Sequence, residues 1–297
     1  MKYFSLFSGI GGFELGIKQA YKSIQRGRCQ TAHSPNDLPM PRSRFEWGRR
    51  DEQSPSCVGF SEIDKYAIKI YKKHFPNHKE YGDVTNIKWS NVPDFELLCG
   101  GFPCQSFSIA GKRGGFSDTR GTLFFEIAKA AQEKQPRLLL LENVKGLLSH
   151  DKGRTFGTIL NTLDEFGYDL QWQVLNSKNF GVPQNRERIF IIGHLRTTPR
   201  PQVFPLRQNV QISMQRQRQI SPTITKRYYK QGQSDPYIFD EEKIKIRRLT
   251  PTECERLQGF SDGWTEDISD TQRYKCLGNA VTTNVISAIM EKLLFST

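Results

Sequence analysis

The sequence predicts an α/β protein in which helices cover both faces of a mixed, mostly parallel β-sheet, with a second, smaller domain attached. Short, wholly apolar runs alternate with helical patterns through residues 1–193, as in sheets that are buried on both faces. A basic stretch from His194 to Ile246 interrupts this alternation and predicts a separate module.

The first predicted element is a short buried strand, Tyr3–Phe7, followed by a glycine-rich turn and a helix that ends near Gln25. Residues 26–56 are polar and proline-rich without periodicity, which predicts an inserted loop. A second strand over Cys57–Ser61 then precedes a helix that ends near His74.

Apolar runs and helical periodicity locate the remaining elements. A third strand is predicted to end near Gly82–Asp83. Further strands are predicted over Phe95–Cys99, Leu138–Leu141 and Arg188–Gly193, and helices over Gly121–Glu133, Thr155–Phe166, Pro251–Leu257 and Thr282–Leu294.

The composition, with 36% hydrophobic and 25% charged residues, is that of an ordinary globular chain. No run approaches the roughly 18 apolar residues of a membrane span, and the N-terminus has no signal-peptide pattern, so we expect a cytoplasmic protein. The six cysteines form no CxxC pair and have no histidine at metal-ligand spacing. Neither a metal site nor a disulfide framework is therefore expected.

The net charge of +12, with a pI near 9.4, indicates a polyanionic partner. From His194 to Arg248 the chain has 12 Lys and Arg residues against 4 Asp and Glu, a local excess of 8. A solvated basic face is the alternative. Tyr228, Tyr229 and Tyr237 lie among these charges and favour phosphate contact.

Glycine and polar residues follow several predicted strands, at the edge where open parallel sheets bind ligands. They are Gly9–Gly12, Glu62, Asp83, Cys104 and Glu142. The glycine turn can bring backbone close to a ligand, although Glu14 replaces the third glycine of the dinucleotide fingerprint. Glu62 can accept ribose hydroxyls and Asp83 can read an adenine edge; a helix N-cap or a turn is the alternative for each acid.

Cys104 follows Pro103 in a glycine- and serine-rich loop, where a thiolate can act as a nucleophile. An inert buried cysteine is the alternative. Glu142 ends the apolar strand in LLLLENV, where a carboxyl can share or donate a proton. The structural alternative there is Asn143 as the cap of a following short helix.

Arginines alternate with other residues in QNRERIFIIG, which places Gln184, Arg186 and Arg188 on one face of a strand. A solvated strand edge is the alternative. A thiolate, a protonatable carboxyl and a guanidinium together suit attack on a flat, electron-poor heterocycle.

These motifs, in this order, make the chain similar to the DNA (cytosine-5)-methyltransferases over nearly its whole length. FSGIGG resembles the first motif of that family, which binds S-adenosylmethionine (AdoMet). GGFPCQSFS resembles the nucleophile motif, ENV the glutamate motif and QNRERIFIIG the arginine motif. RRLTPTECERLQGF and YKCLGNAV resemble the ninth and tenth motifs.

The resemblance implies a Rossmann-like catalytic domain, residues 1–193 and 271–297, which binds AdoMet as its cofactor. It implies that Cys104 adds to carbon 6 of a flipped-out cytosine, that Glu142 holds ring nitrogen 3, and that Arg188 holds the carbonyl oxygen while Arg186 supports the loop. Implied cofactor contacts are Phe7, Gly9, Ile10, Gly11, Gly12, Glu62, Ile63, Asp83, Val84, Gly101, Pro103, Leu123, Asn279 and Val281.

By the same resemblance, residues 194–270 form a small target-recognition domain for double-stranded DNA. SPTIT, residues 221–225, is similar to a short Thr-Leu element of the family, with Ile224 in place of the leucine. Expected DNA contacts are Gln105, Ser108, Arg216, Arg218, Thr223, Ile224, Lys226, Arg227 and Tyr228. The expected enzyme is a monomer that protects host DNA beside a cognate restriction endonuclease.

Two other functions stay open at this point. An RNA cytosine methyltransferase would share the scaffold, although the long basic region disfavours it. A catalytically silent DNA-binding module is disfavoured by the presence of Cys104, Glu142, Arg186 and Arg188 together.

Overall fold

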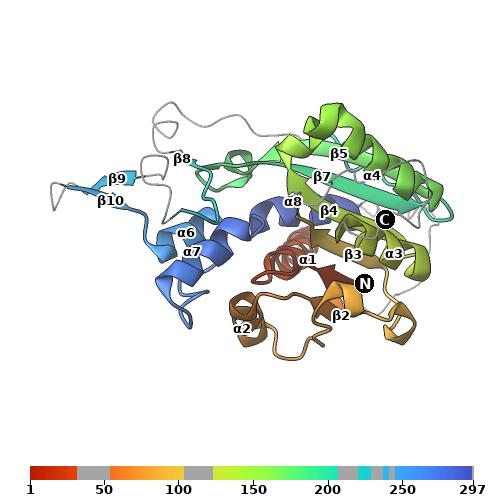
Figure 1. Cartoon of the computed structure of the whole chain (residues 1–297), viewed down its shortest axis with the longest axis horizontal. Coiled ribbons are helices and arrows are strands. Elements are labelled where there is room, and N and C mark those ends of the chain that lie inside the picture. The colour runs from red at the N-terminus through yellow and green to blue at the C-terminus, as the bar shows by residue number, and fades with distance from the viewer. Residues whose placement is uncertain (32–53, 104–122, 207–219, 229–236, 241–244, 296–297) are drawn as a thin grey trace.

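The computed structural model describes residues 1–31, 54–103, 123–206, 220–228, 237–240 and 245–295. Through its middle runs a six-stranded sheet of strand order β2-β1-β3-β4-β7-β5 (Figure 1). The strands are β1 (Lys2–Leu6), β2 (Ser56–Ser61), β3 (Leu97–Gly101), β4 (Leu138–Val144), β5 (Tyr168–Asn176) and β7 (Glu187–Leu195). β1 pairs in parallel with β2 and β3, and β3 with β4, whereas β7 runs antiparallel to both β4 and β5. The predicted mixed, mostly parallel sheet is confirmed.

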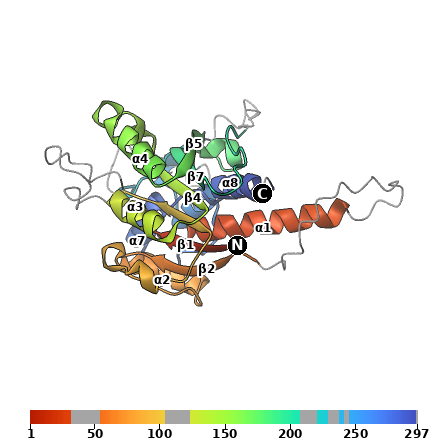
Figure 2. The ribbon, with the colours of Figure 1, turned by 90° about the vertical axis from the view of Figure 1, so that its right-hand side faces the viewer.

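Helices cover both faces of this sheet (Figure 2). Side chains of a strand point alternately to its two faces, so Leu139 and Leu141 pack with α3 (Leu123–Lys134) and α4 (Arg154–Glu165). Leu138 and Leu140 pack with α1 (Gly12–Thr31) and α8 (Thr283–Phe295) on the opposite face. The wholly apolar strand LLLL is thereby buried on both sides.

A third apolar cluster lies beside the carboxyl end of β1. Ile10, which follows that strand, packs with α2 (Lys65–His74), α6 (Pro251–Leu257) and α7 (Asp270–Asn279). α6 begins where the sequence supplies a capping box, in which Thr250 and Glu253 each accept a hydrogen bond from the other's backbone N–H. This cluster holds the C-terminal motifs against the first glycine turn.

The remaining elements are short. An antiparallel hairpin, β9 (Tyr237–Asp240) with β10 (Lys245–Arg248), projects from the body next to α6 (Figure 1). β6 (Gln184–Asn185) pairs in parallel with β8 (Ser221–Pro222). Short 3₁₀ turns are η1 (Val84–Asn86), η2 (Trp89–Asn91), η4 (Lys145–Leu148), η5 (His150–Gly153) and η6 (Ser177–Phe180).

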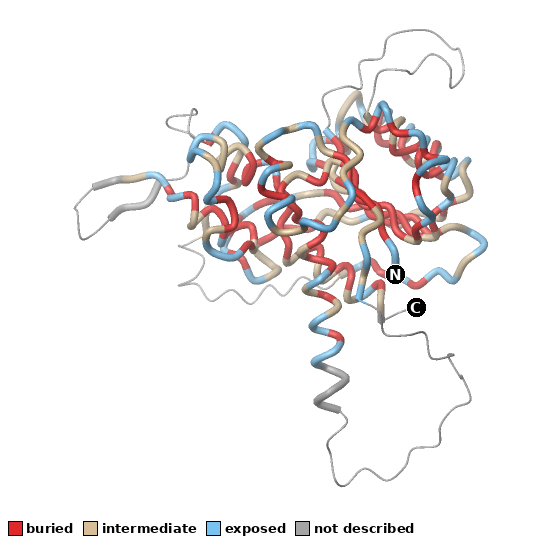
Figure 3. Tube along the Cα trace, turned by 90° about the horizontal axis from the view of Figure 1, so that it is seen from below, coloured by how far each residue is buried: buried red, intermediate tan, exposed pale blue. Residues whose placement is uncertain are grey.

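The structure corrects several expectations about the elements. The strand expected to end near Gly82–Asp83 is reduced to one isolated bridge between Phe60 and Glu80, because Gly82 turns the backbone with a φ of +67° and Asp83 starts η1. α1 continues past Gln25 to Thr31 and projects from the body, so residues 26–31 belong to the helix and not to the inserted loop (Figure 3).

The elements predicted from the sequence do not include β5, α7 or the short strands β8, β9 and β10. β5 alternates polar and apolar residues over YDLQWQVLN, a pattern typical of a half-buried strand that was available in the sequence. α7 is mostly polar, and only Cys276, Leu277 and Gly278 are buried, so its apolar periodicity is weak.

Candidate active site

A cavity of about 600 Å³ opens at the carboxyl ends of β1, β2, β3 and β4. Ligands of open α/β sheets bind at this edge because the helices do not cover it. The residues that line it come from both ends of the chain: Phe7, Gly9, Ile10, Ser61, Glu62, Ile63, Asp64, Ala67, Asp83, Val84, Gly101, Phe102, Pro103, Leu123, Glu142, Asn143, Val144, Arg186, Arg188, Thr225, Lys226, Cys276, Gly278 and Asn279.

The expected cofactor residues therefore line one cavity, apart from Gly11, Gly12 and Val281, which do not line it. Gly11 has a φ of +88°, which L side chains rarely adopt. A Cβ on Gly12 would lie 2.8 Å from Cγ1 of Val281. The glycines thus let the turn approach its neighbours closely, and Nε1 of Trp264 donates a hydrogen bond of 2.9 Å to the Ile10 carbonyl.

Glu62 directly follows β2 and lines the cavity. Its Oε2 accepts a hydrogen bond from the backbone N–H of Gly9 at 2.8 Å. Its Oε1 accepts from the N–H groups of Ile63 and Asp64 at 2.8 and 2.9 Å. These three donors orient the carboxylate, and since a carboxylate has about four acceptor positions, Oε2 retains capacity for a ligand hydroxyl.

Asp83 and Glu62 also have the structural roles, a helix N-cap and a turn, that were the alternatives to ligand binding. Asp83 Oδ1 accepts hydrogen bonds from the N–H and the hydroxyl of Thr85, both at 2.9 Å, and so caps η1. Glu62 closes a turn through its own Oε1. Both still line the cavity, so a capping role and ligand contact are compatible here.

The cavity also has apolar surface suited to a flat ring. The large apolar side chains that are exposed in the described part of the chain are Ile63, Val144 and Trp172. Ile63, which is 73% exposed, and Val144 both line the cavity. Exposed apolar side chains gathered at one concave site indicate a ligand surface, and with the Glu62 carboxylate they fit an adenosine group such as that of AdoMet.

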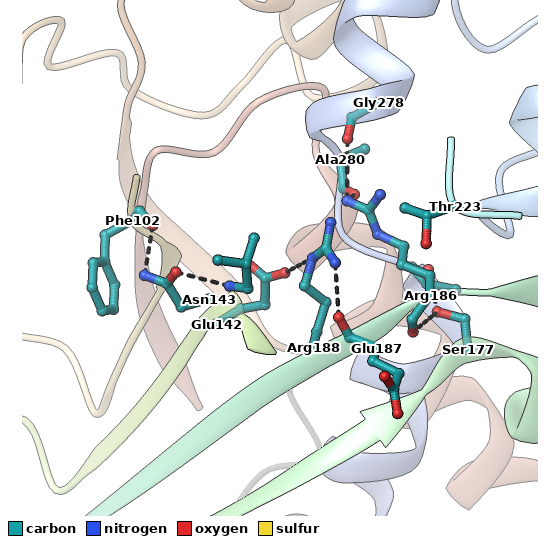
Figure 4. Close-up of polar contacts among 12 residues, drawn as sticks. Phe102, Glu142, Asn143, Ser177, Arg186, Glu187, Arg188, Thr223, Gly278 and Ala280 are labelled. Atoms are coloured by element: carbon teal, nitrogen blue, oxygen red, sulfur yellow. Dashed lines mark hydrogen bonds and ion pairs between the residues drawn. The ribbon is translucent and has the colours of Figure 1, made fainter. Parts of the chain in front are cut away.

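Glu142 and Arg188 form an ion pair on the far side of the cavity, with Arg188 Nε 3.0 Å from Glu142 Oε1. The strand register explains the pair, because Glu142 lies opposite Phe190 and Arg188 opposite Val144, which makes Glu142 and Arg188 diagonal neighbours on one face. Figure 4 shows the Arg188 guanidinium turned toward the Glu142 carboxylate. The antiparallel direction of β7 brings its first residues to the edge where β4 ends.

The structural alternative, in which Asn143 caps the following 3₁₀ turn, is wrong, because that turn has no side-chain cap. The Asn143 amide donates a hydrogen bond of 2.9 Å to the Phe102 carbonyl, and its Oδ1 accepts from the Val144 N–H at 2.8 Å (Figure 4). A Cβ on Gly101 would lie 2.8 Å from Oε2 of Glu142. The chain is thus held closely beside Glu142 just before Pro103.

Cys104 lies outside the described residues, as do Gln105, Ser108, Arg216 and Arg218. Among the cysteines whose side chains are described, Cys276 alone lines the cavity. Burial raises the pKa of the Cys276 thiol to about 12, so it does not supply a thiolate at neutral pH.

Arg186 differs from Arg188 in its surroundings. It is 2% exposed, and its guanidinium donates to the carbonyls of Ile224, Gly278 and Ala280 at 3.0, 3.2 and 2.8 Å. Burial, and then the nearby charge of Arg188, lower its pKa to about 9. Arg186 and the buried Gln184 are therefore not on a solvated strand edge, and the donors of Arg186 are directed at the backbone.

The expected DNA contacts separate into two groups. Lys226 and Arg227 are exposed, and Thr223 is partly exposed. Ile224 and Tyr228 are fully buried in the cluster around α6 and α7, which corrects their assignment to the DNA surface. The apolar Ile224 side chain and the Tyr228 ring, which lies against Tyr274, are stabilised by burial.

Glu14, which stands where the dinucleotide fingerprint has a glycine, is buried behind the turn. Its Oε1 accepts a hydrogen bond of 3.0 Å from the Tyr71 hydroxyl. Burial raises the pKa of Glu14 from its ordinary 4.5 to about 7. Between these values the folded protein keeps a proton that the unfolded chain releases, so this contribution to the free energy of unfolding falls as pH rises and is lost above about pH 7.

The substitution Glu14→Gln, which stays neutral at every pH, should therefore become more stable relative to the wild type as pH rises. A shift of this size corresponds to about 3 kcal/mol between about pH 4 and pH 8. Urea denaturation of both proteins at the two pH values measures the difference. An equal difference in stability at both pH values would contradict the assignment.

No group of three or more His, Cys, Asp or Glu side chains able to hold a metal ion occurs among the described residues. Within the same part of the chain, no helix has the length and apolar character needed to cross a membrane.

The fold is the Rossmann-like fold of the AdoMet-dependent methyltransferases, with the cavity at the carboxyl ends of its parallel strands. Two solved structures share the fold: DNMT2 of Spodoptera frugiperda, with a TM-score of 0.71 and 18% identity over 99% of both chains, and Dnmt2 methyltransferase of S. pombe, with a TM-score of 0.71 and 18% identity over 99% of this chain and 98% of that one. These likenesses establish the architecture.

Residues 1–211 and 200–294 match the C-5 cytosine-specific DNA methylases, and the chain belongs to this family. It is 37% identical to the Type II methyltransferase M1.ScrFI of Lactococcus lactis subsp. cremoris, over 99% of this chain and 78% of that protein. It is 30% identical to the Type II methyltransferase M.HhaI of Haemophilus parahaemolyticus, over 97% of this chain and 93% of that protein. The protein is a DNA (cytosine-5)-methyltransferase that uses AdoMet as its methyl donor.

Proposed function

We propose that this enzyme methylates a flipped-out cytosine through a covalent adduct with Cys104, with Glu142 and Arg188 holding the base. One observation carries the proposal. The Glu142–Arg188 ion pair and the Glu62 carboxylate line the same cavity of about 600 Å³, so a base and a methyl donor would meet within it.

The proposed reaction begins with the Cys104 thiolate, which forms a bond to carbon 6 of the cytosine. The electron pair of the 5,6 double bond is displaced to carbon 5 and, through carbon 4, to ring nitrogen 3. Glu142 stabilises this negative charge by holding ring nitrogen 3 and the exocyclic amine. Arg188 donates to the carbonyl oxygen and orients Glu142 through its Nε. Carbon 5 then forms a bond to the methyl group, and S-adenosylhomocysteine is the leaving group. Loss of the carbon 5 proton to solvent and breakage of the bond between carbon 6 and the Cys104 sulfur restore the 5,6 double bond and release the thiolate.

AdoMet, when bound, supplies an electrophilic methyl group. Glu62 would accept its ribose hydroxyls, Asp83 would read the adenine edge, and Ile63 would pack on the adenine face. The turn from Phe7 to Ile10 and the C-terminal Asn279 would close the pocket from two sides, since all of these residues line one cavity.

We further propose that residues 1–193 and 271–297 form the catalytic domain and residues 194–270 the target-recognition domain. The exposed Lys226 and Arg227 would contact DNA from the edge of the cavity, together with Thr223. Gln105, Ser108, Arg216 and Arg218, outside the described residues, would add further contacts. The net charge of +12 supports a polyanionic substrate.

The biological role we propose is protection of host DNA in a restriction-modification system, because the relatives named above are Type II methyltransferases. In this role the enzyme would work as a monomer in the cytoplasm, and a cognate endonuclease would cut the same sequence.

The experiment that tests the function uses the full-length protein. Bisulfite sequencing of plasmid DNA from cells that express it should reveal 5-methylcytosine at one short sequence and so identify the target. A duplex with 5-fluorocytosine at that site should then form an adduct with the enzyme and AdoMet that resists SDS. Unmodified plasmid DNA, together with tritium transfer from AdoMet to tRNA, would refute the proposal in favour of an RNA substrate.

A further inference from the structure

Two buried polar side chains lie between two segments that the reaction needs. We define the recognition segment as residues 221–228 and the cofactor segment as residues 278–281. Gln184 is fully buried and Arg186 is 2% exposed. Gln184 belongs to β6, and Arg186 is the single residue between β6 and β7, two residues before Arg188. We call residues 184–186 the β6–β7 stretch; the side chains of Gln184 and Arg186 are both buried.

Gln184 and Arg186 together hold both polar backbone atoms of Ile224 in the recognition segment. Gln184 Oε1 accepts a hydrogen bond of 3.0 Å from the Ile224 N–H. Arg186 Nη1 donates one of 3.0 Å to the Ile224 carbonyl. Thr223 adds a third link, because its hydroxyl donates to the Asn185 carbonyl at 2.6 Å. The recognition segment is thus fixed to the β6–β7 stretch residue by residue.

The same Arg186 guanidinium also holds the cofactor segment. Its Nη2 donates to the carbonyls of Gly278 and Ala280 at 3.2 and 2.8 Å, on either side of Asn279 (Figure 4). The two segments are in direct contact, since a Cβ on Gly278 would lie 2.3 Å from the Thr225 carbonyl carbon. One planar side chain therefore joins both segments through two nitrogens that are held apart in a fixed plane. A lysine ammonium, whose donors all lie on one nitrogen, cannot reproduce this geometry.

We infer that Arg186 is a positioning residue that couples DNA recognition to cofactor binding. It acts by keeping the recognition segment in register with the cofactor segment. Its Nη1 and Nη2 are directed at backbone carbonyls and leave Arg188 as the arginine on the base. This inference rests on the proposed function, in which residues 221–228 meet DNA and Asn279 meets AdoMet. If one guanidinium orders both segments, binding of either ligand favours binding of the other by the same factor.

A binding cycle tests this coupling without any methyl transfer. The probes are S-adenosylhomocysteine, which has no methyl group to donate, and a duplex that carries the site mapped by bisulfite sequencing. Calorimetry of the wild type should give a cofactor affinity about tenfold higher with the duplex than without it. In Arg186→Lys this factor should fall to about two or less, because the link between the two segments is broken.

Two further variants make the result decisive. Arg196→Lys changes an exposed arginine just after the end of β7, where it pairs with Asp164 and Asp169, and it should keep the wild-type factor. Thr223→Val removes the hydroxyl link at a partly exposed position and should lower the factor even if Arg186→Lys does not fold.

Three results would overturn the inference. The first is a coupling factor in folded Arg186→Lys that equals that of the wild type, and the second is a factor near one in the wild type itself. The third is an unchanged factor in Thr223→Val when Arg186→Lys does not fold. Because the cycle measures affinities only, its failure is distinct from the absence of methylation or of the 5-fluorocytosine adduct, which would refute the proposed function itself.

Discussion

Cys104→Ala is expected to abolish both methyl transfer and the 5-fluorocytosine adduct. Carbon 5 of cytosine is not nucleophilic until carbon 6 carries a substituent, and the thiolate is the group that adds there. Cys104 directly follows Pro103, a residue of the cavity wall. Tritium transfer from AdoMet to the mapped duplex and SDS gels of the trapped complex measure the two effects.

None of the thiols in the described part of the chain is suited to replace Cys104. Burial raises the pKa of Cys57, Cys254 and Cys276 to about 12, and Cys99 is fully buried. Cys57→Ala, which removes a thiol outside the cavity, is the matched control and should keep full turnover and trapping. Retained turnover in Cys104→Ala would show that the nucleophile is another group.

Glu142→Gln is expected to lower kcat by about 10²- to 10⁴-fold, the range that positioned acid–base groups contribute. Glutamine has nearly the same shape, so it can still contact ring nitrogen 3, but it cannot share or donate a proton. It also replaces the ion pair with Arg188 by a neutral contact. Affinity for the duplex should stay within a few-fold of the wild type, because the loss concerns the transition state.

Single-turnover kinetics with saturating duplex and AdoMet measure the effect of Glu142→Gln on the chemical step. Glu187→Gln is the control. Glu187 is an exposed carboxylate next to Arg188, and its Oε2 lies 2.9 Å from Lys145 Nζ. It should change the rate no more than a few-fold. A Glu142→Gln enzyme as fast as this control would exclude a proton-handling role for Glu142.

Much of the fold was readable in the sequence because the buried strands have unambiguous patterns. LLLL and RIFIIG are apolar at every position or nearly so, as strands covered on both faces must be. β5 and α7 were missed because each is polar on much of its surface. The strand expected before Asp83 was wrong because local apolar content does not reveal that Gly82 turns the chain away after one bridge.

The site shows the same division. Glu62, Asp83 and Glu142 were predicted at one edge because each follows or ends a strand, and the structure brings all three to one cavity. Tyr228 was expected at the DNA because it lies among basic residues. It is buried, however, and its hydroxyl accepts a hydrogen bond of 2.6 Å from the Leu249 N–H. Charge and composition predict a surface, but they do not tell which side chain of a segment faces it.

The sequence by itself determined the class of protein, five of the six strands of the sheet and the order of the reacting groups along the chain, because motifs and hydrophobic periodicity are local properties of the chain. Only the tertiary structure decided how those groups meet. The antiparallel register of β7 pairs Arg188 with Glu142, and the donors of Arg186 reach carbonyls 38 to 94 residues away in the sequence. Such contacts depend on which backbone carbonyls the folded chain brings within hydrogen-bond distance of the guanidinium. No local sequence pattern predicts those carbonyls.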